Sequence, residues 1–147
     1  MSKIIDSFTE KNSFLSNFTP CRVSYAGVQF LSVEAAFQAA KCKEWEDTLK
    51  FRFLSAAESK KLGRTVKMRA DWDDARNYRL VVMEQLLREK FSDKNPELKQ
   101  KLIDTYDAEL VEGNTWNDTF WGVCGGVGKN HLGILLMKIR KDLIRKG

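Results

Sequence analysis

The sequence predicts one compact, mostly helical unit with a small β component. Six stretches carry helical periodicity or helix-start signals, whereas only a few short stretches alternate like strands. The chain has 147 residues, enough to bury a core, with only two prolines and no repeat or linker. We therefore expect a single domain over residues 1–147.

The composition is that of an ordinary globular chain, with 43% hydrophobic and 31% charged residues. No apolar run approaches the ~18 residues that cross a bilayer, and residues 1–6 lack the apolar segment of a secretory leader. We therefore expect a cytoplasmic protein. Three scattered cysteines and a single histidine argue against a disulfide framework, a metal centre and a Ser-His triad. Acid–base chemistry must come from other side chains, and no metal or cofactor is expected.

Local signals predict the elements of the first half of the chain. Ala26-Gly27 suits a hairpin turn, Ser55 with Glu58 forms a capping box, and Gly63 suits the position after a helix. The expected elements are an aromatic-rich ordered loop at 7–20, a hairpin at 23–30, helices at 33–41, 45–53 and 56–62, and a short strand at 64–69.

The second half is predicted in the same way. Asn95-Pro96 supplies the N-cap and first residue of a helix. The loop at 114–130 holds two tryptophans and four glycines, and a loop this long inside a compact domain favours a function. The expected elements are the longest helix at 71–91, a helix from 96 to about 105, a short strand or extended segment at 109–112 and an amphipathic terminal helix at 132–143.

The helix expected at 33–41 carries the most informative pattern. Ser32 is a good N-cap. Glu34, Gln38 and Lys41 share one line along the helix, and Glu34 sits in the first turn, where the helix dipole favours a carboxylate. This line is either a solvated helix edge or the polar wall of a cleft. Beside it runs an apolar stripe of Val33, Ala36, Phe37 and Ala40.

Two features of the 114–130 loop suggest ligand binding. Glycines at 125–128 run into a helix start, where backbone amides can bind an anion, although they also suit a tight turn. Val123 and Asn130 replace the first glycine and the Ser/Thr of a Walker A loop, so NTP hydrolysis does not follow.

The same loop contains Trp116 and Trp121 on either side of Asp118. Their indoles either fill the core or stack a flat base. Asp118 either caps the loop or adds a second carboxylate near the base.

The net charge of +5 suggests an anionic partner. Much of the excess lies at 138–146, in the last turns of the terminal helix, where cations are favoured in any case. A solvated helix face and a nucleic-acid patch both fit this charge.

Taken in order, the motifs resemble the NADAR family, also called YbiA-like, from about residue 14 to residue 143. The matching segments are Phe14-Leu-Ser-Asn-Phe18, Ser32-Val-Glu-Ala-Ala-Phe-Gln-Ala-Ala-Lys41, Ala57-Glu-Ser-Lys-Lys-Leu-Gly-Arg64, Asp71-Trp72, Leu110-Val-Glu112, Phe120-Trp-Gly122 and Gly128-Lys-Asn-His-Leu-Gly-Ile-Leu-Leu-Met137 with Arg140.

The resemblance implies an α+β, largely helical fold and an N-glycosidase activity. Members of the family cleave ribosylamino-pyrimidine phosphates, which are intermediates of riboflavin synthesis, or remove ADP-ribose from modified guanine, also within DNA. The resemblance thus implies a phosphorylated, nucleotide-like small molecule or an ADP-ribosylated guanine as partner. The basic excess leans slightly towards a nucleic-acid-linked substrate.

Carried onto this chain, the family motifs place the active site at Glu34, Gln38 and Lys41, and the loop motifs add Asp118, Trp121 and Asn130. Further substrate-binding candidates are Asn17, Arg64, Arg69, Trp116, Gly122, Gly128 and Lys129. Ala35 departs from the family, in which a bulkier polar residue such as histidine is common.

An N-glycosidic bond breaks through an oxocarbenium-like sugar, which defines the roles. Glu34 stabilises the positive charge or activates water, and Asp118 is the weaker candidate for this or holds ribose hydroxyls. Lys41 is either the proton donor or an amine that forms a Schiff base with the opened sugar. Gln38 orients the ribose. The tryptophans stack the base, and Arg64, Arg69, Lys129 and the 125–128 backbone contact phosphates.

Two other classes compete with an N-glycosyl hydrolase. A non-catalytic nucleotide or ADP-ribose binding module would use the glycines, tryptophans and basic residues, but it has no need of Glu34 and Lys41 together. A general nucleic-acid binder rests on charge alone and predicts salt-dependent binding to any DNA. We rank the enzyme first and the general binder last.

Overall fold

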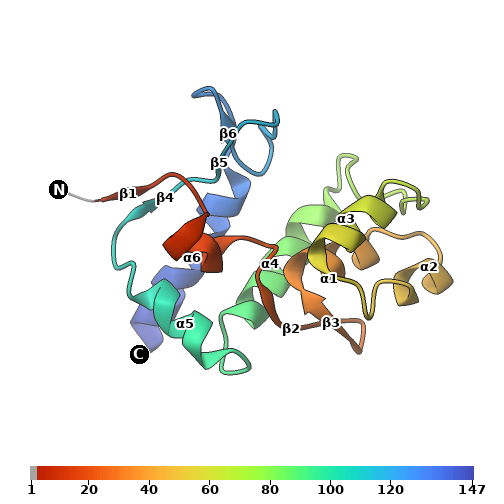
Figure 1. Ribbon diagram of the computed structural model, residues 1–147, viewed down its shortest axis with the longest axis horizontal. Coiled ribbons are helices and arrows are strands. Elements are labelled where there is room, and N and C mark those ends of the chain that lie inside the picture. Colours follow the sequence, from red (N-terminus) through yellow and green to blue (C-terminus); the bar gives the residue numbers. More distant parts are fainter. Residues whose placement is uncertain (1–2) are drawn as a thin grey trace. The chain divides into compact units, whose positions relative to one another are not determined.

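The computed structural model describes residues 3–147 (Figure 1). These residues form two compact units, which we describe separately. The central unit comprises Asn17–Pro96, and the terminal unit combines the residues up to Ser16 with Glu97–Gly147. Residues 1 and 2 lie outside the described range, and the expected single domain over 1–147 stays a prediction.

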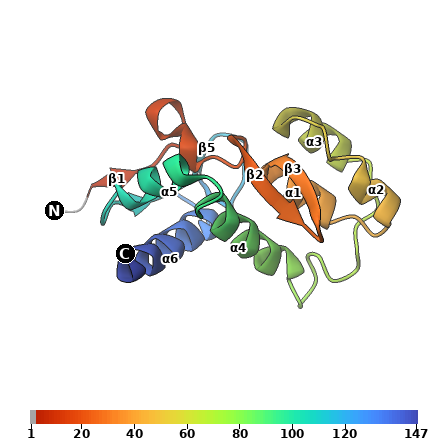
Figure 2. The same ribbon diagram turned by 90° about the horizontal axis from the view of Figure 1, so that it is seen from below.

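The central unit begins with the predicted hairpin. Strand β2 (Pro20–Tyr25) pairs antiparallel with β3 (Val28–Ser32). Both turn residues have positive φ, 50° at Ala26 and 82° at Gly27, as the tight turn between two twisted strands requires. Figure 2 shows the hairpin beside helix α1, and its inward residues Val23 and Phe30 are buried.

Four helices complete the central unit: α1 (Val33–Ala40), α2 (Trp45–Leu49), α3 (Ala56–Gly63) and α4 (Tyr78–Lys90). Helix α1 packs against the hairpin, α3 and α4. The apolar stripe predicted for α1 is buried throughout, and the N-cap at Ser32 and the capping box of Ser55 and Glu58 are also confirmed.

Several boundaries in this unit differ from the predictions: among them, the helix expected at 45–53 ends at Leu49, and the hairpin expected at 23–30 extends from Pro20 to Ser32. The helix expected from residue 71 begins only at Tyr78, because Asn77 adopts a left-handed φ of 49° that interrupts the helical path. The expected strand at 64–69 is reduced to one bridge between Cys42 and Met68. Gly63 is the last residue of α3 rather than the residue after it.

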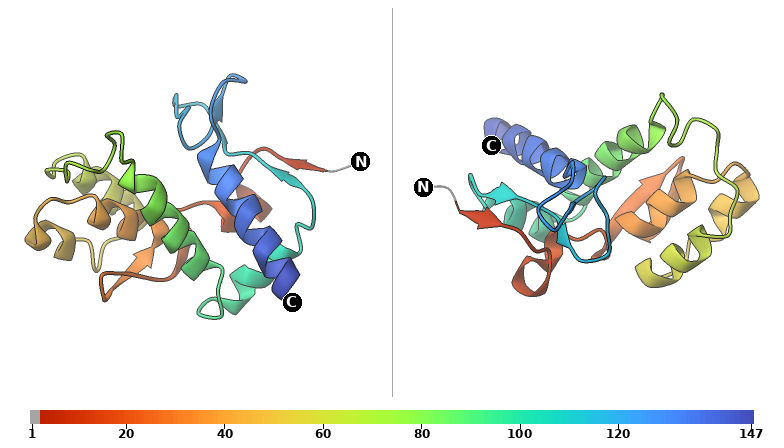
Figure 3. Two further views of the ribbon diagram at one scale, coloured as in Figure 1. Left: turned by 180° about the vertical axis from the view of Figure 1, so that it is seen from behind. Right: turned by 90° about the horizontal axis from the view of Figure 1, so that it is seen from above.

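The terminal unit is built around two small parallel pairs and one long helix. Strand β1 (Ile4–Ile5) pairs with β4 (Glu109–Leu110), and β5 (Gly113–Asn114) pairs with β6 (Val123–Cys124). The helices are the 3₁₀ helix η1 (Glu10–Leu15), α5 (Pro96–Ile103) and α6 (His131–Lys146). Figure 3 shows the looped segment that precedes α6.

Helix α6, not the helix in the middle of the chain, is the longest at 16 residues. Its inner face buries Leu132, Leu136 and Ile139, and it packs against β4, where Leu110 is fully buried. The expected α+β fold, mostly helical with a small β component, is thereby confirmed.

Among residues 3–147, no helix combines the length and the apolar character needed to cross a membrane.

Lys90, at the end of α4, is an unusual member of the core. Its side chain is 0% exposed. Burial lowers the pKa of its ammonium from the usual 10.5 to about 7, although the nearby Cys21 opposes this shift. An unfolded chain would keep this lysine protonated up to its ordinary pKa, so between about pH 7 and 10.5 the unfolded state binds more protons. Stability from this group therefore rises with pH across that window.

Replacing Lys90 with methionine removes this penalty. At pH 6 the Lys90→Met variant should be more stable than the parent by on the order of 3 kcal/mol, and the difference should shrink by pH 9.5. Urea unfolding at the two pH values measures the free energies. Lys61→Met, at an exposed position of α3, is the control and should show no such pH-dependent gain. An equal effect of Lys90→Met at both pH values would contradict the prediction.

Candidate active site

The start of α1 is fixed by two hydrogen bonds. The hydroxyl of Ser32 accepts from the backbone N–H of Ala35 at 3.1 Å. The backbone carbonyl of Asn17 accepts from the backbone N–H of Glu34 at 3.0 Å. Asn17, predicted to bind substrate, therefore lies beside Glu34 and holds the first turn of the helix through its main chain.

Glu34 and Gln38 interact directly, as their spacing along one helix face requires. The Nε2 of Gln38 donates to the Oε2 of Glu34 at 3.0 Å. The Oε1 of Gln38 is buried and has no hydrogen-bond partner among the described residues. Rotation of the amide by 180° would bring this oxygen against the Glu34 carboxylate, so the observed orientation is the one that suits an ionised Glu34.

Gly63 of α3 determines where the Gln38 amide can lie. A Cβ atom at position 63 would meet the Gln38 Oε1 at 2.0 Å and its Cδ at 2.6 Å. Only a residue without a side chain leaves room for the amide at this crossing of α1 and α3. The sequence analysis assigned Gly63 to the end of a helix. It gave no signal for the close approach of Gly63 to the Gln38 amide.

Lys41 follows the last turn of α1 and is half-buried. Its carbonyl accepts from the backbone N–H of Arg69 at 2.8 Å, which ties the end of α1 to the segment before α4. Burial lowers the pKa of the Lys41 ammonium, and the nearby Cys42 and Glu34 oppose this shift only in part. The ammonium forms no hydrogen bond or ion pair with any residue in the range 3–147. Its protons are thus available to a ligand.

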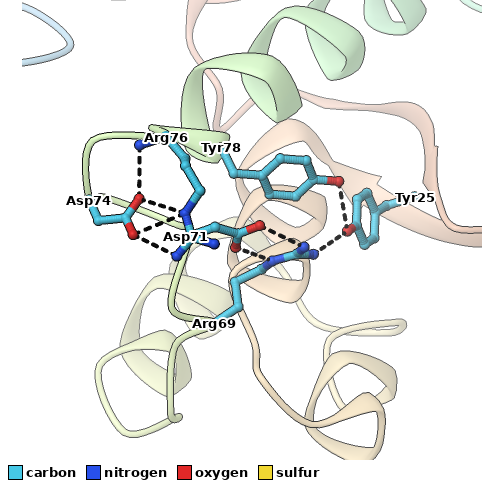
Figure 4. A network of polar contacts seen from close by, with 6 residues as sticks. All are labelled: Tyr25, Arg69, Asp71, Asp74, Arg76 and Tyr78. Atoms are coloured by element: carbon cyan, nitrogen blue, oxygen red, sulfur yellow. Dashed lines mark hydrogen bonds and ion pairs between the residues drawn. The ribbon is translucent and has the colours of Figure 1, made fainter.

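Arg69, proposed for phosphate binding, already has a carboxylate partner (Figure 4). Its Nε and Nη2 donate to the two carboxylate oxygens of Asp71 at 2.6 and 3.0 Å, and this pairing raises the pKa of the guanidinium. Its Nη1 donates to the hydroxyl of Tyr25 at 3.3 Å, and it stacks over the ring of Tyr78 at 4.1 Å. A bidentate, stacked arginine of this kind stabilises the segment before α4.

The aromatic partners of Arg69 extend the same cluster inward. The hydroxyls of Tyr25 and Tyr78 lie 3.3 Å apart, and burial together with this hydrogen bond raises the pKa of Tyr25 to about 12. The buried Trp72 packs on Tyr78 and, at a ring distance of 4.8 Å, on Phe37 of α1. Arg64, the other arginine proposed for phosphate, is the exposed C-cap of α3.

The predicted residues of the terminal unit lie in the loop before α6. Asp118 uses its Oδ1 to accept from the backbone N–H groups of Phe120 and Trp121 at 3.2 and 2.9 Å. This is the loop-capping role that we weighed against a catalytic one. Trp121 is half-buried with its ring edge-on to Phe120, whereas Trp116 is 62% exposed.

The backbone amides at the start of α6 are already paired, whereas the phosphate contact expected of the 125–128 backbone stays a prediction. The backbone N–H groups of residues 129–132 all donate to carbonyls of residues 119–122, at 2.8 to 3.3 Å. These amides are therefore not available to a phosphate. Gly125 and Gly126 form an exposed turn between Cys124 and Val127, which bond to each other through both main-chain groups. Lys129 places its ammonium 5.9 Å from the ring centre of Phe120.

Asn130, Gly122 and Gly128 hold this loop against β4. The Oδ1 of Asn130 accepts from the backbone N–H of Glu112 and its Nδ2 donates to the carbonyl of Leu110, both at 3.0 Å. A Cβ at Gly122 would meet the Glu112 carbonyl oxygen, and one at Gly128 would meet the Gly122 carbonyl oxygen, each at 2.1 Å. The family motif here thus coincides with a close approach of three backbone segments.

The predicted site residues therefore fall into two groups. The central unit brings together Asn17, Glu34 and Gln38, with Lys41 at the end of the same helix. The terminal unit gathers the loop residues from Trp116 to Asn130. Within residues 3–147, no three His, Cys, Asp or Glu side chains are arranged to hold a metal ion.

Comparison with known proteins decides the family. The model of the NADAR domain matches residues 5–144. This chain belongs to the NADAR family. It is 33% identical to the N-glycosidase YbiA of Escherichia coli, over 95% of this chain and 88% of YbiA. The NMR structure of YbiA superimposes with a TM-score of 0.84 at 32% identity, over 99% of this chain and 88% of that chain.

A second relative is a riboflavin biosynthesis protein of Vibrio vulnificus, VVA0006. It is 38% identical over 91% of this chain, but the chain spans only 36% of its length. The family and its curated N-glycosidases confirm the expected class of enzyme, an N-glycosyl hydrolase.

The contact of Gly63 with Gln38 yields a test inside the site. In Gly63→Ala the added methyl would displace the Gln38 amide and so break its hydrogen bond to the Glu34 carboxylate. We expect the rate of glycosidic cleavage to fall by about tenfold or more, with a smaller effect on substrate affinity. If Gly63 acts through Gln38, the same change should cost much less in a Gln38→Ala background. Equal losses in both backgrounds would show that Gly63 acts by another route.

Proposed function

We propose that this NADAR protein hydrolyses the bond between C1′ of a phosphorylated ribose and the nitrogen of a heterocyclic base, with Glu34 and Lys41 as the reacting side chains. The observation that carries this proposal is the polar line of α1. It combines an oriented carboxylate and an amide that fixes it, both on one short helix with a buried opposite face, with an ammonium of lowered pKa at the C-cap of that helix.

In this mechanism the C1′–N bond breaks and its electron pair leaves with the base nitrogen. Lys41 supplies the proton that this nitrogen takes up, and a lowered pKa makes its ammonium a stronger acid. Glu34 stabilises the positive charge that develops on the sugar. A water molecule then adds to C1′ and gives up one proton, which restores the lysine.

The names of the relatives support the ribosylamino-pyrimidine phosphate class of substrate. The Vibrio vulnificus relative is named for riboflavin biosynthesis, and E. coli YbiA is named an N-glycosidase. ADP-ribosyl-guanine is the second candidate, because it offers the same N-linked, phosphorylated ribose and because the chain carries a net charge of +5.

For the remaining predicted residues we assign narrower roles. Arg64 is exposed beside Gly63 and is our candidate phosphate contact in the central unit. Arg69 has its strongest donors engaged by Asp71, so we expect its contribution to be structural. In the loop of the terminal unit, the exposed ring of Trp116 remains a candidate for stacking a base. The cytoplasmic location also stays a prediction.

Analysis of products by mass spectrometry tests the reaction. The protein is incubated with a ribosylamino-pyrimidine phosphate and, separately, with an oligonucleotide that carries ADP-ribosylated guanine. Release of free base and a ribose phosphate from the first substrate supports our proposal. Release of ADP-ribose from the second alone would move the chain to the other substrate class. Intact substrate in both arms would overturn the proposed reaction on these two substrates.

The first variant to measure is Glu34→Gln. It keeps the shape of the side chain and removes the charge that stabilises the transition state, so we expect the rate to fall on the order of 10²-fold or more. Glu46→Gln, at an exposed position of α2, is the matched control and should keep full activity. A folded Glu34→Gln protein with near-normal turnover would exclude Glu34 from the role.

The pH dependence separates the two roles of Lys41. A proton donor acts in its charged form, so activity should decline as pH rises through the lowered pKa of Lys41, which lies below 10.5. A Schiff-base nucleophile acts in its neutral form, so activity would instead increase over this range. In Lys41→Met, activity should show neither the decline nor the increase with pH. Trapping of an adduct on Lys41 by borohydride during turnover would support the Schiff base.

A further inference from the structure

The terminal unit contains a pocket that the proposed reaction does not use. It has a volume of about 530 Å³. Its walls come from three segments: the N-terminal strand with Lys3, the 3₁₀ helix η1, and the end of α5 with the turn that follows at residues 101–108. This size is within the usual range of small-molecule sites. None of the residues assigned to the glycosidic reaction lines it.

Lysines outnumber carboxylates among the residues that line this pocket. Lys3, Lys11 and Lys101 line it and are all exposed, and none forms an ion pair with a described residue. Two carboxylates, Asp104 and Asp107, also contribute to the wall. Asp104 accepts from the side chain of Gln100 at 2.8 Å.

A buried arginine adds to this charge from behind the wall. Arg140 of α6 is only 6% exposed, and its Nη1 donates to the hydroxyl of Thr105, a lining residue, at 2.9 Å. Burial lowers the pKa of its guanidinium, and Asp107 opposes this shift. Asp107 therefore interacts electrostatically with a buried cation. With three lysines and Arg140 against two carboxylates, the charge around the pocket is positive.

Strained backbone places an aromatic ring at the same pocket. Tyr106 has a φ of 53° and its side chain is 71% exposed. A left-handed conformation is strained for a tyrosine, and such strain is concentrated at functional sites. Glu10, the first residue of η1, also has a positive φ of 52°. Two segments that form the pocket are thus strained, and one of them presents a ring to solvent.

We propose that this pocket binds a nucleoside diphosphate, with its phosphates on Lys3, Lys11 and Lys101 and its base on the ring of Tyr106. Ammonium groups provide the hydrogen-bond donors and the charge that phosphate oxygens require. An exposed aromatic ring can stack against any of the nucleobases. The same chemistry serves a free nucleotide and the end of a single-stranded nucleic acid. The site goes beyond the proposed glycosidase reaction, since it depends on neither Glu34 nor Lys41.

Titration of the full chain with ADP, followed by ¹H–¹⁵N NMR and calorimetry, tests the site. We expect the largest shift changes at residues 101–108 and in η1. Lys101→Ala and Lys11→Ala should each weaken ADP binding about tenfold. Lys141→Ala, at an exposed position of α6 outside the pocket, removes the same charge and should leave the affinity unchanged. A second titration uses a short single-stranded oligonucleotide. If the oligonucleotide binds more tightly than ADP, the ligand of this pocket is the end of a single-stranded nucleic acid rather than a free nucleotide.

Tyr106→Asn keeps a residue that tolerates positive φ and removes the ring. It should weaken ADP binding about tenfold, because stacking is lost, while its melting temperature stays equal or rises, because the strain is relieved. Measuring both the ADP affinity and the melting temperature separates a role of Tyr106 in binding from a role in folding. Absence of ADP binding at millimolar concentration would overturn the proposal. Shift changes confined to other residues, or an affinity that Lys101→Ala and Tyr106→Asn both leave unchanged, would overturn it as well.

Discussion

The alanine-rich face of α1 is the constraint on which the central unit depends. Ala35, Ala36, Ala39 and Ala40 are all buried, and their small side chains let the hairpin, α3 and α4 approach the helix closely. That approach brings Gly63 against Gln38 and so sets the orientation of the Glu34 carboxylate. The positions of Glu34 and Gln38 therefore depend on how the hairpin, α3 and α4 pack against α1. Larger residues in place of the alanines would change these positions without contacting the substrate.

The same region keeps several polar atoms without partners. The side-chain oxygens of Asn17, Gln38 and Ser59 are buried and accept or donate no hydrogen bond among the described residues. Each such group costs roughly 1–3 kcal/mol. Asn17 and Gln38 both contact Glu34 or its main chain, so this cost falls on the residues around the reacting carboxylate. Functional sites are where folded proteins retain interactions that are poor for stability.

Sequence patterns predicted those features that depend on neighbouring residues. The capping box at Ser55, the turn at Ala26-Gly27 and the buried stripe of α1 are local, and all were confirmed. The line of Glu34, Gln38 and Lys41 followed from helix geometry alone. Contacts between distant segments left no such signal. Arg69, predicted to bind phosphate, is paired with Asp71, and four carbonyls of the preceding loop accept from the backbone amides at the start of α6. The left-handed Asn77 cut short a helix whose periodicity alone suggested seven further residues.

The parallel pairing of β1 with β4 has a consequence for synthesis on the ribosome. Ile4 pairs with Glu109, so the strand at the start of the terminal unit leaves the ribosome roughly 105 residues before its partner. During that interval the whole of the central unit, Asn17–Pro96, is made and can collapse around α1. The nascent chain must therefore carry an unpaired β1 until β4 has been made. The terminal unit can therefore form its first strand pair only after the whole central unit has been synthesised.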